Sequence, residues 1–325
     1  MPSFRTGRVG AIVTERAGLQ RVDTTEGRAY VLTELTGPVA TGDDVVLNTT
    51  AVDLGLGTGG WHVVHWNLSR DSWSAPGPGH IVKLRYTSLQ ADTGAAEEHA
   101  EHLPSTLDGM PVVACTLHSQ VGVVAAVLRH LRPEARIVYV MTDGAALPIA
   151  ISDLVDDLLR TGTVDATVTS GNAFGGQYEA VSLPSALVVA RHVAGAQVVV
   201  AGMGPGVVGT GSALGTTAVE AATIVDVSAA LGGCPVLCAR MSDGDDRLRH
   251  QGVSHHTRTV ADLIRTEGVA VPRPDEVAGL PDAAAVLAAA GLRVTTMGRG
   301  PDEDPLFFAA CAAAAAVAAQ RLPSR

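Results

Sequence analysis

The sequence predicts an α/β protein: a Rossmann-like, mostly parallel sheet with helices on both faces, preceded by a small N-terminal antiparallel β-barrel. Two observations predict this fold. From Phe4 to about Leu68 the chain runs in short β-type segments without a helical period, and beyond them apolar strands alternate with helical segments. The chain has 325 residues, which suits two domains, and we expect these to span residues 1–76 and 80–325.

The N-terminal strands are short and are separated by residues that favour turns. The five segments are GRVGAIVTER, LQRVDT, RAYVLTEL, DDVVLNTTAV and WHVVHWNL. Five strands of this length at such close spacing are typical of a small barrel. The stretch SAPGPG at residues 74–79 then interrupts the pattern, so we place the domain junction there.

The second region repeats a unit of strand and helix. Its strand segments are HIVKLRYTSL, PVVACTL, RIVYVMT, DATVTSG, QVVVAGMG, PVLCARM and LRVTTMGRG. Strands that are apolar on both faces are typical of a parallel sheet covered by helices on both sides. The segment LFFAACAAAAAVAA near the C-terminus is shorter than the ~20 residues that a bilayer requires, so we expect a helix packed on the protein body or on a second subunit.

The composition narrows the possible functions. Lys and Arg number 23 and Asp and Glu 33, a net charge of −10, and with no basic cluster this argues against a nucleic-acid partner. The N-terminus lacks the pattern of a signal peptide and the four cysteines form no C-x-x-C pair, so we expect a cytoplasmic protein without a membrane partner and with cysteines in its core. A single lysine, Lys83, among many alanine, glycine and arginine residues is typical of a bacterial chain encoded by GC-rich DNA.

Polar and glycine-rich segments follow five of the predicted strands. The five stretches are LHS, MTDGAALP, TSGNAFGGQ, GMGPGVVGTGSALG and RMSDGDDRLRHQGVSHHT. The carboxyl ends of parallel strands lie at one edge of a sheet, where doubly wound proteins bind their ligands. We therefore expect one small-molecule site at this edge.

These stretches also carry a resemblance to a known family. TDGAALP, NAFGG, GMGPGVVGTG and RHQGVSHHT, together with NTTAVDLGLGTGG in the barrel, resemble an uncharacterised bacterial family, the domain of unknown function 3866, over nearly the whole chain. The resemblance implies no established activity, so no catalytic residue is carried over. The chain departs from the family pattern at Asn172, where a histidine is usual, and at Gln177, where an acid is usual.

The glycine-rich stretch follows a strand and precedes a helix, so its amides and the helix N-terminus could bind an anion through Gly204, Gly206, Gly209, Thr210 and Gly211. Three of the glycines fit G-x-G-x-x-G, but further glycines extend the motif and no acid ends the next strand, which disfavours NAD. The absence of G-K-[ST] disfavours ATP in a P-loop. A tight turn without a ligand is the alternative.

Three histidines, His250, His255 and His256, fall within seven residues. Imidazole is a ligand for zinc, manganese and iron, and it is also the commonest general base near neutral pH. The pattern is consistent with a catalytic role for these histidines and with a bound divalent metal. The candidate metal ligands are His250, His255, Asp143 and Asp245.

Neighbouring His255 and His256 would point to opposite sides of an extended strand, so both can contact one ion only if the backbone turns there. Ser254 and Thr257 could instead cap the helix that follows, with the histidines simply hydrogen-bonded.

Four more residues are candidates. Asp143 directly follows a strand and could act as a base or hold a cation, or it could only stabilise its turn. His118 ends another strand and is a candidate substrate contact. Lys83 and Arg85 alternate on one strand face and could reach an anion, or they could be solvated charges of an edge strand.

Three functions are consistent with these observations. The first is a hydrolase or transferase for a small anionic or phosphorylated metabolite, in which His250 or His255 moves a proton and Asp143 orients it. The second is a non-catalytic metabolite-binding or regulatory protein. The third is an assembly protein, and the apolar C-terminal helix leads us to expect a homodimer. The density of titratable groups at one edge favours the enzyme.

Overall fold

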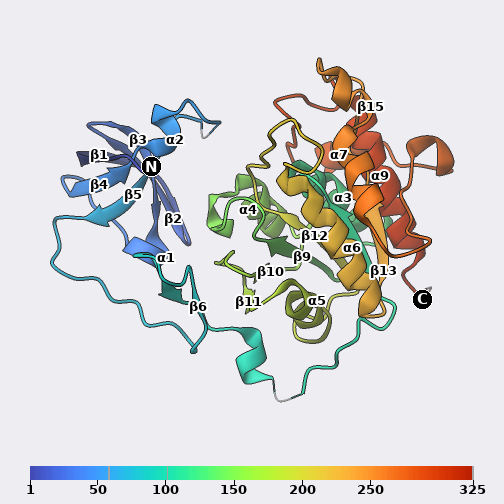
Figure 1. Cartoon of the computed structure of the whole chain (residues 1–325), viewed down its shortest axis with the longest axis horizontal. Helices are drawn as coiled ribbons and strands as arrows, with labels where there is room; N and C mark the ends of the chain where they lie inside the picture. Colours follow the sequence, from blue (N-terminus) through green and yellow to red (C-terminus); the bar gives the residue numbers. More distant parts are fainter. Residues whose placement is uncertain (58, 101, 324–325) are drawn as a thin grey trace. The chain divides into compact units, whose positions relative to one another are not determined.

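The computed structural model describes residues 1–57, 59–100 and 102–323. The chain divides into two compact units, Met1–Gly94 and Ala95–Arg325 (Figure 1).

The first unit contains the predicted barrel. Its strands are β1 (Phe4–Arg16), β2 (Leu19–Thr24), β3 (Gly27–Leu32), β4 (Asp44–Asn48) and β5 (His62–Asn67), with one-turn helices α1 (Thr33–Thr36) and α2 (Thr50–Asp53) between them. The strands close in the order β1-β2-β3-β5-β4 around a core of small apolar side chains that includes Val22, Val31 and Val45. The pairs are antiparallel except β3–β5, which is parallel.

The segment HIVKLRYTSL does not begin the large sheet, as the sequence had suggested. Only β6 (Val82–Lys83) is extended, and it pairs with β7 (Ala91–Asp92) inside the first unit. Leu84 and Tyr86 have φ angles of 53° and 62°, and these left-handed conformations end the strand.

The second unit contains a six-stranded sheet, and every pair in it is parallel, which confirms the Rossmann-like prediction. Its order is β11-β10-β9-β12-β8-β13. The strands are β8 (Pro111–Cys115), β9 (Ile137–Thr142), β10 (Ala166–Ser170), β11 (Tyr178–Ala180), β12 (Val198–Met203) and β13 (Cys234–Cys238). The short strand β11 was not predicted, because it follows β10 through a loop rather than a helix.

Helices cover both faces of this sheet (Figure 1). On one face lie α3 (His118–Leu131), α4 (Asp153–Arg160), α8 (Ala283–Ala289) and α9 (Pro305–Gln320). On the other lie α5 (Leu183–His192), α6 (Glu220–Ala230) and α7 (His255–Leu263). Neighbouring strands β8 and β12 therefore lead to helices on opposite faces, which makes their carboxyl ends a topological switch point.

The alanine-rich helix α9 is buried within its own unit. It packs against α3, α8, β8 and β13, and alanines such as Ala312 and Ala314 are fully buried. Its apolar character is thus explained without a second subunit. In the described residues no helix is long and apolar enough to cross a membrane.

The segment LRVTTMGRG is not a strand of the sheet. Thr296 and Arg299 bond each other's backbone across a tight turn, with Met297 at a φ of 50° and Gly298 at 84°. The remaining short elements are η1 (Ala96–His99), η2 (Ile149–Ile151), η3 (Thr217–Val219), η4 (Leu248–His250), η5 (Pro274–Glu276), β14 (Met241–Ser242) and β15 (Gly252–Val253).

Candidate functional site

His118 joins three segments at the carboxyl edge of the sheet. It is the first residue of α3, whose N-cap is Leu117. Its Nδ1 lies 3.2 Å from the carbonyl oxygen of Met203 at the end of β12, and its Nε2 lies 2.7 Å from the hydroxyl of Ser152. Burial lowers the pKa of His118 to about 4, so its ring is neutral near pH 7.

The contact between His118 and Ser152 has the residue types of a base and a nucleophile. However, Ser152 is 5% exposed, and its hydroxyl also accepts from the amide of Val155 as the N-cap of α4. A hydroxyl that caps a helix and is covered by protein cannot meet a substrate in this conformation. We therefore assign the pair to the architecture of the edge.

Asp143 meets the loop after the neighbouring strand and the start of α6. Its Oδ2 accepts from the amide of Asn172, 3.1 Å away. Glu220, the first residue of α6, accepts from the hydroxyl of Thr142 at 2.7 Å, and burial raises its pKa, to which the charge of Asp143 also contributes. The edge thus carries two neighbouring carboxylates where the sequence suggested one.

The glycine-rich stretch after β12 is bonded to itself. The amide of Thr210 donates to the carbonyl of Gly215, the amide of Val208 donates to the hydroxyl of Thr217, and Thr216 caps η3 through its side chain. The amides of Thr210 and Val208 are therefore already engaged, whereas an anion contact through Gly204, Gly206, Gly209 and Gly211 stays a prediction. Gly206 and Gly211 have φ angles of 98° and 85°, which explains glycine at both positions, while Gly204 and Gly209 pack beside Ala146 and Thr216.

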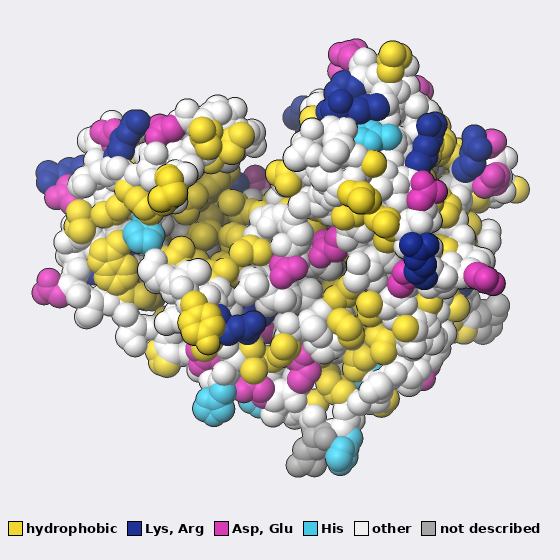
Figure 2. All heavy atoms as spheres, in the orientation of Figure 1, with side chains coloured by type: hydrophobic (Ala, Val, Ile, Leu, Met, Phe, Trp, Pro, Cys, Tyr) yellow, Lys and Arg dark blue, Asp and Glu magenta, His cyan; other side chains and the backbone are white. Residues whose placement is uncertain are grey.

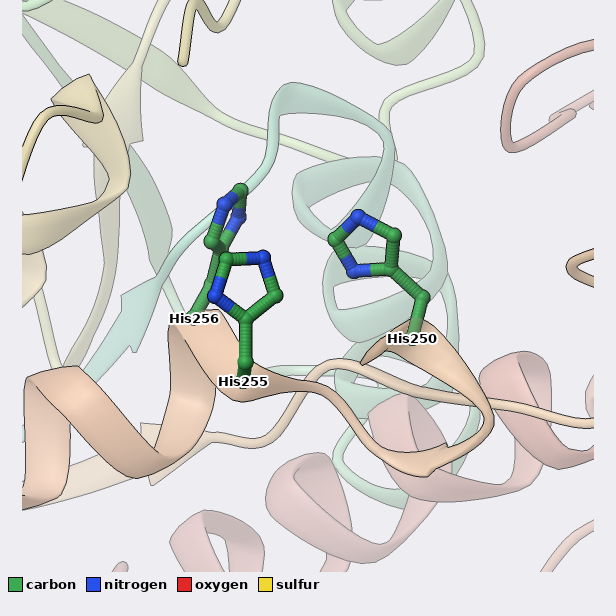
Figure 3. Close-up of side chains that lie close together, drawn as sticks. All are labelled: His250, His255 and His256. Atoms are coloured by element: carbon green, nitrogen blue, oxygen red, sulfur yellow. The ribbon is translucent and has the colours of Figure 1, made fainter. Parts of the chain in front are cut away.

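The three histidines form a cluster beyond the end of β13 (Figure 3). One ring nitrogen from each of His250, His255 and His256 lies within 4.8 Å of the other two. Nε2 of His255 and Nδ1 of His256 are buried and have no hydrogen-bond partner within the described chain. A buried nitrogen without a partner is costly, and a metal ion is one group that would satisfy it.

The helix start explains how adjacent histidines reach one point. Ser254 is the N-cap of α7, and its hydroxyl accepts from the amide of His256 and also contacts Nδ1 of His250 at 2.8 Å. His255 and His256 occupy the first turn of α7, where the backbone turns, and their ring centroids are 4.2 Å apart. The cap and the cluster, which the sequence offered as alternatives, are built by the same segment.

All three imidazoles are held neutral. Burial, aided by the charges of Arg240 and Arg247, lowers the pKa of His250 to about 3. Burial and the neighbouring His255 lower that of His256 to about 4, and burial and Arg249 lower that of His255. Neutral imidazole is the form that binds metals, so no proton has to leave at neutral pH.

Asp245 lies beside the cluster but its oxygens are already engaged. Arg247 bonds both of them at 2.8 and 2.9 Å, and Arg240 and Arg299 each approach Oδ2 to 3.2 Å. Arg247 above all holds the pKa of Asp245 well below its usual range. A carboxylate with three guanidinium partners is a poor metal ligand, and neither Asp245 nor Asp143 belongs to the histidine group.

The edge therefore holds two groups of candidate residues. The first group lies at the ends of β8, β9 and β12 and consists of His118, Asp143 and Gly204. The second group is the histidine cluster, which follows β13. The two groups are linked through α7, which contacts η3 directly after the glycine-rich stretch. Lys83, which is buried, and Arg85, which donates to the carbonyl of Val82, belong to the first unit. Their contact with an anion stays a prediction.

Sequence reasoning missed several residues of these groups. Glu220 could have been found, since it stands in the first turn of the helix that follows the glycine-rich stretch. The partners of the histidine cluster, Arg240 and Arg249, carried no signal beyond their proximity in sequence. Gln177, where the family pattern has an acid, bonds the backbone amide of Thr167 and is structural here.

The fold and the site define a class of protein: a Rossmann-like α/β protein with an N-terminal five-stranded barrel and a histidine cluster beyond the carboxyl end of its last strand. The chain belongs to the family described as Protein of unknown function (DUF3866), whose sequence model matches residues 28–283, more than three quarters of the chain. The match confirms the resemblance. No curated protein and no solved structure matches the chain.

Proposed function

We propose that this protein is a metal-dependent hydrolase or transferase that acts on a small anionic metabolite. One observation carries the proposal: three neutral imidazoles present nitrogens within 4.8 Å of one another, and two of the rings have a buried nitrogen that finds no partner among the residues the structure describes. The residues that would hold the ion are His250, His255 and His256.

A three-histidine site suits catalysis better than structure. Structural zinc sites use four protein ligands, whereas catalytic sites use three and leave a position for water or substrate. A divalent ion held in this way lowers the pKa of bound water and polarises a substrate oxygen. Ser254 supports this role, because its hydroxyl contacts Nδ1 of His250 and would fix the orientation of that ring.

The surroundings favour an anionic substrate. Arg247 and Arg249 are exposed on the segment that carries His250, and Nε of Arg249 lies 3.4 Å from Nε2 of His250. Figure 2 shows histidine and basic side chains together at the surface around β15 and α7. This arrangement supports an anion contact through the arginines, in addition to the one predicted for the glycine-rich stretch.

We further propose that the protein works in the bacterial cytoplasm and binds neither nucleic acid nor a membrane. A homodimer would have to use a surface other than α9, which is buried in its own unit. A non-catalytic binding protein is the alternative, and an assay of phosphate-ester turnover by the metal-loaded protein separates the two.

The test is metal content together with thermal stability. We expect purified protein to contain zinc, manganese or iron, and its unfolding temperature to fall on chelation and recover when the metal is restored. His255→Ala should abolish both effects. His130→Ala, which removes an exposed histidine on α3, is the matched control and should change neither. Wild-type protein that neither contains nor binds a divalent metal would refute the proposal; bound metal without turnover of phosphate esters would favour the binding protein.

A further inference from the structure

The hydrogen bonds of His250 define which of its nitrogens can meet a metal. Nε2 accepts from Nε–H of Arg249, so the ring proton lies on Nδ1, which donates to the hydroxyl of Ser254. This is the tautomer that a metal bound at Nε2 requires. The lone pair of Nε2 is therefore available to a cation, and in this structure the guanidinium of Arg249 lies at the position that a metal would take.

Arg249 differs from its neighbours in how its charge is balanced. Arg247 is paired bidentately with Asp245, and Arg240 is buried against the same carboxylate. Arg249 is exposed on η4, and it forms no salt bridge in the part of the chain that the structure describes. Its charge is free to pair with an anion that approaches from solvent.

We propose that Arg249 is the substrate-anion contact of the metal centre and that the anion is a phosphoryl group. This inference rests on the proposed function. The guanidinium of Arg249 donates to Nε2 of His250, and a metal held by that nitrogen would release the guanidinium to bind a phosphoryl group.

The geometry of the ligands favours a phosphoryl group over a carboxylate. A guanidinium binds two oxygens at once through its planar fork, and a metal needs a third. A phosphate monoester has three terminal oxygens and can serve both, whereas a carboxylate has two. Arg249 is thus expected to compete with the metal when no anion is present and to strengthen metal binding when a phosphoryl group is present.

The experiment measures this coupling. Co²⁺ is titrated into the full chain and followed by its visible absorption, with and without methylphosphonate, a stable probe that has the three oxygens of a phosphate monoester. The proteins are wild type, Arg249→Gln, and Arg258→Gln as the matched control, because Arg258 is an exposed arginine on α7. Acetate replaces methylphosphonate in a parallel series.

We expect methylphosphonate to tighten Co²⁺ binding about tenfold in wild type and in Arg258→Gln, and less than twofold in Arg249→Gln. Without the anion, Arg249→Gln should bind Co²⁺ more tightly than wild type. Equal coupling in all three proteins would overturn the role of Arg249 and leave the metal centre standing. Equal coupling by acetate would overturn the phosphoryl assignment. Absence of Co²⁺ binding in wild type would refute the metal centre itself, and the inference with it.

Discussion

Nε2 of His118 lies 2.7 Å from the hydroxyl oxygen of Ser152, and this contact joins the start of α3 to the start of α4. On its other side the ring contacts the carbonyl of Met203, to which the hydroxyl of Tyr139 also donates. A carbonyl only accepts, so Nδ1 carries the proton and Nε2 accepts from the serine. A neutral histidine thus holds together the loops that follow β8, β9 and β12.

This neutral state makes stability depend on pH. Because burial lowers the pKa of His118 to about 4, the unfolded chain binds a proton more readily than the folded one. The stability is fully present above the unfolded pKa of about 6.5 and is lost as the pH falls toward 4. We expect the free energy of unfolding of wild type, relative to His118→Gln, to fall by up to about 3 kcal/mol over that range. Urea denaturation at several pH values measures it; parallel curves for the two proteins would contradict the assignment.

Asp245 is the second residue on which stability should depend strongly. It is 2% exposed and accepts from Arg240, which is itself buried, as well as from Arg247 and Arg299. Removing its charge leaves a buried guanidinium without its counter-ion, which typically costs about 3–5 kcal/mol. We expect this loss in Asp245→Asn, measured by chemical denaturation. Asp246→Asn is the control, since its exposed carboxylate should contribute less than about 0.5 kcal/mol; a similar loss in both would contradict the argument.

Glu220 should titrate in the opposite sense to His118. Burial raises its pKa, so the folded state binds the proton more readily, and stability is lost as the pH rises from the unfolded pKa through the folded one. Glu220→Gln keeps the shape of the side chain and cannot ionise. We therefore expect the variant to gain stability relative to wild type as the pH increases across this window, measured by thermal unfolding. A constant difference across the pH range would show that Glu220 is solvated.

The sequence was most informative where a periodic pattern extended over a whole element. Runs such as Val198–Met203 are buried on both sides, and this alone predicted a parallel sheet. The two segments that failed, HIVKLRYTSL and LRVTTMGRG, also look like strands. Left-handed residues interrupt them at Leu84, Tyr86 and Met297, and single side chains of these types give no warning of such a conformation.

The candidate site was predictable in position more than in its contacts. Parallel strands bring their carboxyl ends together whatever the sequence of the loops, so Asp143, His118 and the histidines were expected at one edge. The contacts within the site depend on how the side chains of one loop pack. This packing decides which nitrogen of His250 contacts Arg249, and it brings three arginines to Asp245. No residue pattern encodes that packing at the level of single atoms.

The placement of α9 yields the last prediction. Ala314 is fully buried on a helix that packs against α3, and small side chains allow the two helices to approach closely. Ala314→Leu adds three carbon atoms to a filled interior, and overpacking of this kind costs about 1–3 kcal/mol. We expect a lower unfolding temperature for Ala314→Leu, whereas Gln320→Leu, at an exposed position of the same helix, should unfold near the wild-type temperature.

Sedimentation velocity separates this packing role of Ala314 from a role in a subunit interface. Because Ala314 faces its own domain, the oligomeric state should be the same in all three proteins. A wild-type dimer that Ala314→Leu converts to a folded monomer would place α9 between subunits instead.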